Sequence, residues 1–277
     1  MRFPITALSA LVLSLVATAQ SPQAPQAPSG PGPFDQCGEL LVASFPPGCV
    51  LFVADDGYTY APDTISSVPP GGRVRLIGTL DPFACGTLCS ESSGCIVGAT
   101  FDLCPVGEPG CFGDGDVCAS CPCGNDMPMG TETGCLNSSG TGAVLRSSGS
   151  SSLSRDELLF FVEDARPDSF AMLASSSNLL PSIGPCAAGS GVPSAMFDGL
   201  RCLGTALTRH GMRATDDSGA VGYLTPCWGA TEYGLAVEAG ATVGQSLHFQ
   251  VFYRDDPAAI CQTGQNTTNV VSITIQS

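Results

Sequence analysis

The chain has 277 residues, of which 43% are hydrophobic, so it can form a buried core and one or two domains. Ten arginines and no lysine oppose 25 acidic residues, which gives a formal charge of −15. This balance excludes the clustered basic surface of a nucleic-acid-binding protein and disfavours docking on anionic lipid, and the missing lysine excludes a P-loop or Schiff-base lysine.

The first residues have the pattern of a secretory signal peptide. A charged start at Arg2 precedes an apolar run from Ile5 to Val16, and a small-residue site follows at 17–19. The apolar run is too short to cross a membrane as a helix. We therefore expect residues 1–19 to be removed and the mature chain to begin at Gln20, without a membrane span and either secreted or held at the cell surface.

Closely spaced prolines between Ser21 and Pro33 predict an extended linker over residues 20–36. A small, cysteine-rich β domain is expected over 37–105. Its strands are predicted at 49–53, 58–60, 73–80 and 95–103, with an Asp55-Asp56-Gly57 hairpin turn after the first. A strongly curved sheet of four or five strands fits this pattern, and a barrel of the oligonucleotide/oligosaccharide-binding type is one possible arrangement.

A turn-rich joint is expected over 106–117, since residues 107–115 show no hydrophobic periodicity. The second domain, 118–277, has many short apolar segments, turn residues between them, and no helix of a dozen residues. This pattern predicts a β-sandwich, jelly-roll-like in its closure. Its strands are predicted at 143–146, 157–163, 170–174, 201–207, 209–214, 219–225, 246–254 and 270–275.

The chain has 15 cysteines, and in an exported protein cysteines usually pair as disulfides. The odd number leaves one thiol unpaired or one bridge between chains. Cys118, Cys121, Cys123 and Cys135 also have the close spacing of zinc ligands, but no pair-to-pair spacing matches a zinc ribbon. Disulfides are therefore the favoured interpretation.

The sequence offers few candidates for catalysis. It has no G-x-S-x-G motif, and the only histidines, His210 and His248, are expected at surface or half-buried strand positions. Neighbouring carboxylates that could serve a glycosidase occur at turns, where Asp usually caps the backbone. These pairs are Asp55/Asp56, Asp156/Glu157, Asp216/Asp217 and Asp255/Asp256.

The sequence also contains candidates for two kinds of binding site, a calcium loop and an aromatic sugar platform. Asp114 and Asp116 alternate like the start of a calcium loop, although the glutamate that closes such a loop is missing. An aromatic sugar platform is the second, although a tryptophan beside a cysteine is more typical of a sandwich core. Its candidate residues are Tyr58, Tyr60, Trp228 and Tyr233. No cofactor is expected beyond this weak calcium candidate.

Several sequence blocks from Cys111 to the C-terminus resemble a module found in many exported proteins of planctomycete-type bacteria. The blocks read CPCGN at 121–125, GCLNSSGTGA at 134–143, FDGLRC at 197–202, FQVFYRD at 249–255 and NTTN at 266–269. Two features depart from the pattern, namely Gln265 in place of an aromatic residue and an insert over 185–195. The resemblance implies an exported, β-rich, disulfide-bonded module and assigns no catalytic residue.

The same resemblance suggests a disulfide pairing in the second domain. The blocks around Cys202 and Cys261 imply that these two cysteines pair, which leaves Cys186 for Cys227. Cys135 is expected to pair with Cys121 or Cys123.

The sequence thus favours a non-catalytic binding or structural module at or outside the cell surface. Its partner would be a glycan or another surface protein. A secreted, carboxylate-dependent hydrolase is the alternative, and a redox role for the Cys121-Pro122-Cys123 segment is less favoured because it lacks thioredoxin-type spacing.

Overall fold

The structure, a computed structural model, describes residues 30–42, 49–69, 73–84, 92–115, 120–180, 194–229 and 234–277. The predicted signal peptide and most of the predicted linker lie outside the described residues. So do several candidate residues, namely Cys85, Cys89, Asp116, Cys118, Cys186 and Tyr233. The regular secondary structure of the described chain is almost entirely β-strand, which confirms the all-β prediction.

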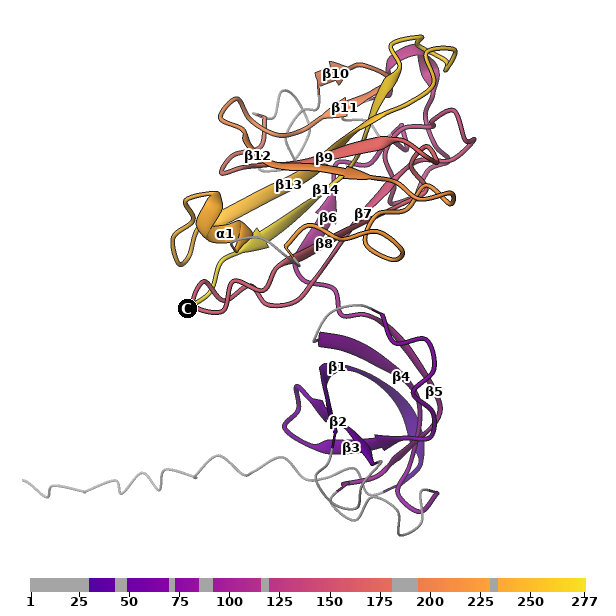
Figure 1. The fold of residues 1–277 in the computed structure, drawn as a ribbon, viewed down its shortest axis with the longest axis vertical. Helices are drawn as coiled ribbons and strands as arrows, with labels where there is room; N and C mark the ends of the chain where they lie inside the picture. Colours follow the sequence, from indigo (N-terminus) through magenta and orange to yellow (C-terminus); the bar gives the residue numbers. More distant parts are fainter. Residues whose placement is uncertain are drawn as a thin grey trace, which may run out of the picture.

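The first five strands form a closed barrel with the order β1-β2-β3-β5-β4 (Figure 1). Neighbouring strands are antiparallel except β3 and β5, which are parallel. This five-stranded arrangement matches the oligonucleotide/oligosaccharide-binding type of barrel. The strands are β1 (Gly32–Val42), β2 (Val50–Ala54), β3 (Thr59–Pro62), β4 (Arg73–Asp81) and β5 (Cys95–Leu103).

Strand β1 is a correction to the sequence analysis, which assigned residues 20–36 to a linker. The strand already begins at Gly32, and Phe34 is buried in the barrel core with its ring 4.6 Å from that of Tyr60. Pro33 suggested a linker because proline donates no hydrogen bond, but proline is accepted close to the start of a strand. Gly38 lets β1 pair with both β2 and β4, since a Cβ there would collide with the Val53 carbonyl.

The other barrel strands lie where the sequence predicted them. In β4, Val74, Leu76 and Leu80 are buried while the side chains between them are not. The predicted hairpin turn joins β2 to β3, and Gly57 has the positive φ of 85° that such a turn requires. A disulfide between Cys37 and Cys104, with Cα atoms 5.5 Å apart, ties β1 to the residue after β5.

The later strands form a two-layered unit above the barrel in Figure 1. One layer is a five-stranded antiparallel sheet in the order β12-β9-β13-β14-β6, and the other is the β7-β8 pair. These strands are β6 (Glu108–Gly110), β7 (Val144–Ser148), β8 (Leu159–Glu163), β9 (Phe170–Ser176), β12 (Thr208–Ala214), β13 (Ser246–Arg254) and β14 (Gln265–Thr274).

An apolar core lies between the two layers, as a sandwich requires. Phe160 of β8 packs on Phe249 of β13 with ring centroids 4.4 Å apart, and Trp228 is fully buried in the same core. The outer face of the large sheet is covered by loops, by the hairpin of β10 (Ser194–Met196) and β11 (Gly199–Arg201), and by disulfides. The helical elements are short, namely η1 (Pro122–Gly124) and α1 (Leu235–Glu238).

Four predictions in this unit were wrong. The joint was expected to hold no packed element, but β6 pairs with β14 inside it. Residues 219–225 contribute a single bridge at Val221 instead of a strand. The strand predicted at 201–207 does not form, because β11 already ends at Arg201 and only Leu203 makes an isolated bridge, to Leu179. β14 starts at Gln265, five residues before the predicted start, because the polar side chains of the NTTN block are buried and hydrogen-bonded instead of forming a loop.

Candidate functional site

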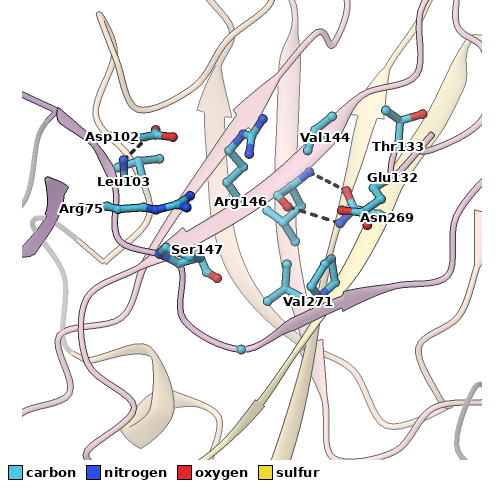
Figure 2. A pocket seen from close by; sticks show the side chains of 14 residues that line it. Arg75, Asp102, Leu103, Glu132, Thr133, Val144, Arg146, Ser147, Asn269 and Val271 are labelled. Atoms are coloured by element: carbon cyan, nitrogen blue, oxygen red, sulfur yellow. Dashed lines mark hydrogen bonds between the residues drawn. The ribbon is translucent and has the colours of Figure 1, made fainter. Parts of the chain in front are cut away.

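A pocket of about 310 Å³ lies at the junction of the barrel and the two-layered unit (Figure 2). Its lining comes from β4 and β5 of the barrel, from the connection through β6, and from β7 and β14. Junctions between folded units are common places for ligand sites, and this volume is at the lower end of the range for small-molecule pockets. The polar lining residues are Arg75, Asp102, Glu132, Thr133, Arg146, Ser147 and Asn269.

One wall of the pocket is strand β7, which side-chain hydrogen bonds fix in place. The carboxamide of Asn269 accepts from the backbone N–H of Leu145 at 2.7 Å and donates to its carbonyl at 3.3 Å. The Ser147 hydroxyl donates to the carbonyl of Val106 in the connection from the barrel. Because these groups are buried or half-buried, the wall is firmly positioned relative to β14 and the connection.

Each of the two arginines is held by a carboxylate outside the pocket. Asp35 accepts from Nε and Nη2 of Arg75, both at 2.6 Å, and Glu163 accepts from Nε of Arg146 at 2.7 Å. The hydrogen bond to Asp35 raises the pKa of Arg75. Burial lowers the pKa of Arg146, but the hydrogen bond to Glu163 and the negative charges of Glu163 and Asp102 together raise it overall. Both guanidinium groups are therefore charged and oriented.

The terminal nitrogens of Arg146 have no hydrogen-bond partner within the described part of the chain, so they can donate to a ligand. Carboxylates of Asp102 and Glu132 line the same pocket and supply acceptors, and Asp102 also acts electrostatically on both arginines. The charged side chains of the lining sum to zero. Donors and acceptors in one nearly neutral pocket match a ligand that carries many hydroxyl groups.

None of these lining residues was predicted as a site residue from the sequence, because nothing in one sequence brings β4 next to β7. The only available signal was the rarity of basic residues, since two of the ten in the chain line this pocket.

Most of the paired carboxylates accept hydrogen bonds from backbone N–H groups, as their positions at turns indicated. Asp56 accepts from the N–H of Tyr58, and Asp216 accepts from those of Ser218 and Ala220. Asp156 accepts from two N–H groups at the start of α1. Other members form ion pairs or caps, namely Asp55 with Arg73, Glu157 with Arg155, Asp255 with Ser138 and Asp256 with Ala258.

Asp114, the first calcium candidate, and two of the aromatic candidates are engaged within the fold itself. The carboxylate of Asp114 accepts from the N–H of Gly130 at 3.0 Å, and its predicted companion Asp116 lies outside the described residues. Trp228 and Tyr60 are fully buried, so they cannot stack on a sugar. The aromatic platform is therefore not formed by these side chains.

His210 is a correction, because its side chain is buried instead of lying at the surface. Its Nε2 is 2.8 Å from the hydroxyl of Ser175, and its Nδ1 is 2.5 Å from a carboxylate oxygen of Glu238. The sequence of contacts from Ser175 through His210 to Glu238 is that of the serine, histidine and carboxylate in a catalytic triad. However, Ser175 is only 1% exposed, so the contacts hold α1 against β12 and offer no accessible nucleophile. His248 is half-buried, as expected, and its Nδ1 is 2.8 Å from the Ser272 hydroxyl.

The disulfides correct the pairing that the resemblance suggested. Cys202 pairs with Cys111, and Cys261 pairs with Cys123, so Cys202 and Cys261 are not joined to each other. The reason is that Cys202 and Cys111 pack in the same cluster of buried residues on the outer face of the large sheet, whereas Cys261 lies on the loop after β13.

Cys135 pairs with Cys121, one of the two partners expected for it. These bridges also remove Cys121, Cys123 and Cys135 as zinc ligands. The suggested partner of Cys227, Cys186, lies outside the described residues.

Comparisons with known proteins found few similarities. No family model and no curated protein matches the chain. Among solved structures it is similar to the tetra-tandem repeat in the extending region of a large adhesion protein, with 9% sequence identity and a TM-score of 0.25. The match covers 87% of this chain and 42% of that one. No helix in the described ranges is long and apolar enough to cross a membrane.

Proposed function

We propose that this protein is an exported, non-catalytic binding module at or outside the cell surface, and that the junction pocket binds a glycan. The observation that carries the proposal is the lining of that pocket. It combines oriented guanidinium donors with carboxylate acceptors in a nearly neutral site at the junction of two folded units.

Export is supported by the signal-like N-terminus and by the disulfides. Four bridges join described cysteines, and stable disulfides are typical of oxidising compartments. The formal charge of the chain is −15, so a strongly anionic partner would be repelled at long range. A neutral, hydroxyl-rich ligand meets no such repulsion.

The shape and chemistry of the pocket favour a short glycan over a protein surface. Sugar hydroxyls accept from guanidinium groups and donate to carboxylates, so both kinds of lining group in Figure 2 would be used. Leu103, Val144 and Val271 supply apolar surface for the carbon face of a sugar ring. A pocket of about 310 Å³ has room for a short oligosaccharide end and not for a folded partner.

The test is a glycan array probed with the mature chain, exported into an oxidising compartment so that its disulfides form. Hits are then measured by isothermal titration calorimetry with Arg146→Gln and with Arg209→Gln as the matched control, because Arg209 is an exposed residue of β12 outside the pocket. We expect Arg146→Gln to weaken binding about tenfold or more, since one charge-assisted hydrogen bond contributes about 1.5–3 kcal/mol. Equal affinity of the wild type and Arg146→Gln, or an array with no hits, would contradict the proposal.

A hydrolase is the second candidate, because Asp102 and Glu132 line the same pocket. Two carboxylates facing one sugar could act as acid and base. The experiment is to incubate each array hit with the protein and measure released reducing ends. We expect none, whereas release that Asp102→Asn and Glu132→Gln both abolish would replace the binding function with a glycosidase.

A further inference from the structure

Three segments of the two-layered unit meet at one buried polar centre on the far side of the large sheet from the apolar core. The segment at 121–125, the turn at 197–199 and the loop at 261–265 come together there. The Cys123–Cys261 disulfide joins the first and third segments. The Cys261 sulfur also lies 3.2 Å from the Pro122 carbonyl.

Hydrogen bonds tie the middle turn to both of the other segments. The Asn125 carboxamide donates to the Asp198 carbonyl at 2.7 Å and to the Leu136 carbonyl at 2.9 Å. The backbone N–H of Asp198 donates to the Gln265 carbonyl at 2.9 Å. Since Nδ2 of Asn125 is committed to two carbonyl acceptors, its Oδ1 is identified without ambiguity as the acceptor side of the amide.

Two buried oxygen atoms at this centre have no hydrogen-bond donor among the described residues. They are Oδ1 of Asn125 and Oδ2 of Asp198, and each residue is only 1% exposed. Orphaned buried acceptors are rare in folded proteins, because each one loses its water without a replacement. The two residues are in direct contact through the Asn125 carboxamide and the Asp198 carbonyl, and one of the two unsatisfied oxygens belongs to a carboxylate. A cation is therefore the partner that this pair of acceptors favours.

The charge of Asp198 is also uncompensated. The protein partners of its carboxylate are the N–H of Thr263 at 3.2 Å and the hydroxyl of the same residue at 2.5 Å, both on Oδ1. No arginine or histidine of the described chain forms an ion pair with it. A buried carboxylate without a cation is costly in a low-dielectric interior.

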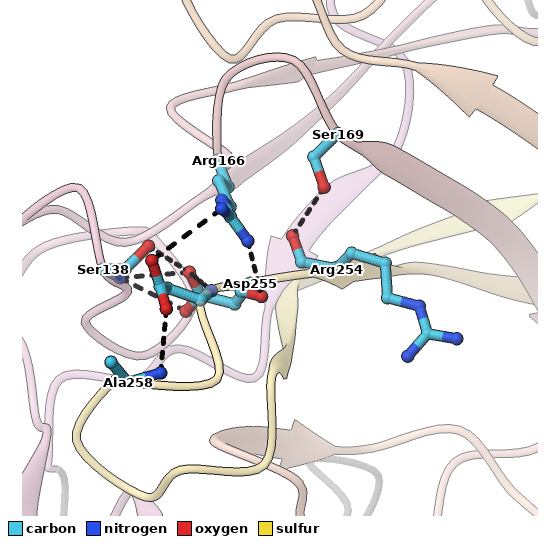
Figure 3. A network of polar contacts seen from close by, with 7 residues as sticks. Ser138, Arg166, Ser169, Arg254, Asp255 and Ala258 are labelled. Atoms are coloured by element: carbon cyan, nitrogen blue, oxygen red, sulfur yellow. Dashed lines mark hydrogen bonds and ion pairs between the residues drawn. The ribbon is translucent and has the colours of Figure 1, made fainter.

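The neighbouring buried carboxylate, Asp255, shows how this chain satisfies such a group when no ligand is involved (Figure 3). Its oxygens accept from the N–H and hydroxyl of Ser138 and from the N–H of Asp256. Arg166 lies alongside and donates to the Asp255 carbonyl at 3.0 Å. Asp255 is 2% exposed and Asp198 is 1% exposed, so the two carboxylates are equally buried and differ only in their hydrogen-bond and charge partners.

We propose that Asp198 and Asn125 are the side-chain ligands of a bound Ca²⁺ ion. Ca²⁺ binds carboxylate, carboxamide and backbone carbonyl oxygens in irregular geometry, and this centre presents the first two as unused atoms among carbonyl-rich loops. Zn²⁺ is disfavoured, since no histidine or free thiolate faces the centre within the described residues and its cysteines are bridged. The ion neutralises Asp198 and links the three segments.

The test uses the mature chain, stripped with EDTA and returned to metal-free buffer. Native mass spectrometry counts bound ions, and the melting temperature is followed as CaCl₂ is added, with MgCl₂ at equal concentration as the ionic-strength control. We expect one Ca²⁺ per chain, a dissociation constant of about 10⁻⁴–10⁻³ M as in other extracellular modules, and a melting temperature that rises with Ca²⁺ by mass action.

The matched variants are Asp198→Asn, which keeps the shape and the acceptor for Thr263, and Asp114→Asn, which removes the carboxylate of the calcium candidate taken from the sequence. We expect Asp198→Asn to lose the bound ion and the Ca²⁺-dependent rise, and Asp114→Asn to keep both. Asp255→Asn controls for burial and should also keep the ion.

Absence of a bound Ca²⁺ in the wild type, or an equal response to Mg²⁺, would overturn the proposal and leave an ordered water as the donor to the two oxygens. Calcium binding that survives Asp198→Asn but not Asp114→Asn would move the site to the loop at 114. If Asp198→Asn does not fold, a wild type without bound Ca²⁺ still overturns the proposal, and loss of the ion in Asp114→Asn still moves the site to the loop at 114.

Discussion

At the scale of single residues, buried amide side chains form hydrogen bonds to backbone groups that have no strand partner. Gln250 accepts from the N–H of Cys202 at 3.2 Å and donates to the carbonyls of Leu200 and Thr268. Asn269 similarly bonds both backbone groups of Leu145. These residues replace the regular hydrogen bonds that the irregular segments lack. Their polar character made the NTTN block look like a loop in the sequence.

Replacing Asn269 tests this role. Asn269→Leu keeps the approximate volume but leaves the N–H and carbonyl of Leu145 without their partner. We expect a loss of about 1–3 kcal/mol in the free energy of unfolding, the cost of unsatisfied buried polar groups. Urea titration followed by circular dichroism measures it, with exposed Asn178→Ala as a control that should change stability by no more than about 0.5 kcal/mol. A stable Asn269→Leu would show that these bonds contribute nothing.

The half-buried His248 predicts a pH dependence of stability. Burial lowers the pKa of its imidazole below the usual value of 6.5, so at mildly acidic pH the unfolded chain binds more protons than the folded one. Stability is therefore complete above about pH 6.5 and is lost as the pH falls through the lower pKa of the folded state.

We expect the melting temperature to fall between about pH 7 and pH 5, and His248→Gln to flatten this part of the profile. Carboxylates such as Asp35 and Asp63, whose pKa values are lowered by hydrogen bonds, act only at more acidic pH. A wild-type profile that is level across this window, or one that is the same in His248→Gln, would be inconsistent with the buried imidazole.

At the scale of elements, the sequence pattern predicted the strands whose apolar residues alternate and missed those fixed by tertiary contacts. β4 and β13 lie close to their predicted ranges because alternation shows directly which face is buried. β1 was missed because Pro33 and the prolines before it suggested a linker, and β6 because three residues carry no periodicity. Each of the two is held mainly by pairing with a distant strand, which no local pattern reports.

The disulfides give a prediction at the same scale. The Cys37–Cys104 bridge closes a much longer loop than Cys121–Cys135, with sequence separations of 67 and 14. In the chain-entropy model its removal by Cys37→Ser/Cys104→Ser should cost about 4 kcal/mol, against about 3 kcal/mol for Cys121→Ser/Cys135→Ser. Urea unfolding of both double variants measures the difference. The reverse order of the two losses would show that native-state effects outweigh loop entropy.

At the scale of the whole molecule, the barrel and the two-layered unit are connected by more than a linker. Arg155 forms an ion pair with Glu39 of β1 at 3.0 Å, and Leu103 at the end of β5 packs with Phe161 of β8. This contact also creates the pocket. The sequence could not predict the site, because its walls come from segments that are far apart in the chain and meet only after both units have folded.

The same contacts predict protease resistance in the connection. Residues 107–115 were expected to form an open joint, but β6 pairs with β14 and Cys111 is bridged to Cys202. Limited proteolysis followed by mass spectrometry should therefore find no early cleavage there. Early cleavage within 107–115 would mean that the pairing of β6 is too weak to protect the backbone.

The most direct test of the account is hydrogen–deuterium exchange of the mature chain with and without the best glycan from the array. A ligand in the junction pocket should slow exchange of backbone amides at 102–107 and 144–147, which line it from the barrel and from β7. Protection confined to other parts of the chain, with these two segments unchanged, would contradict the assignment of the junction pocket as the binding site.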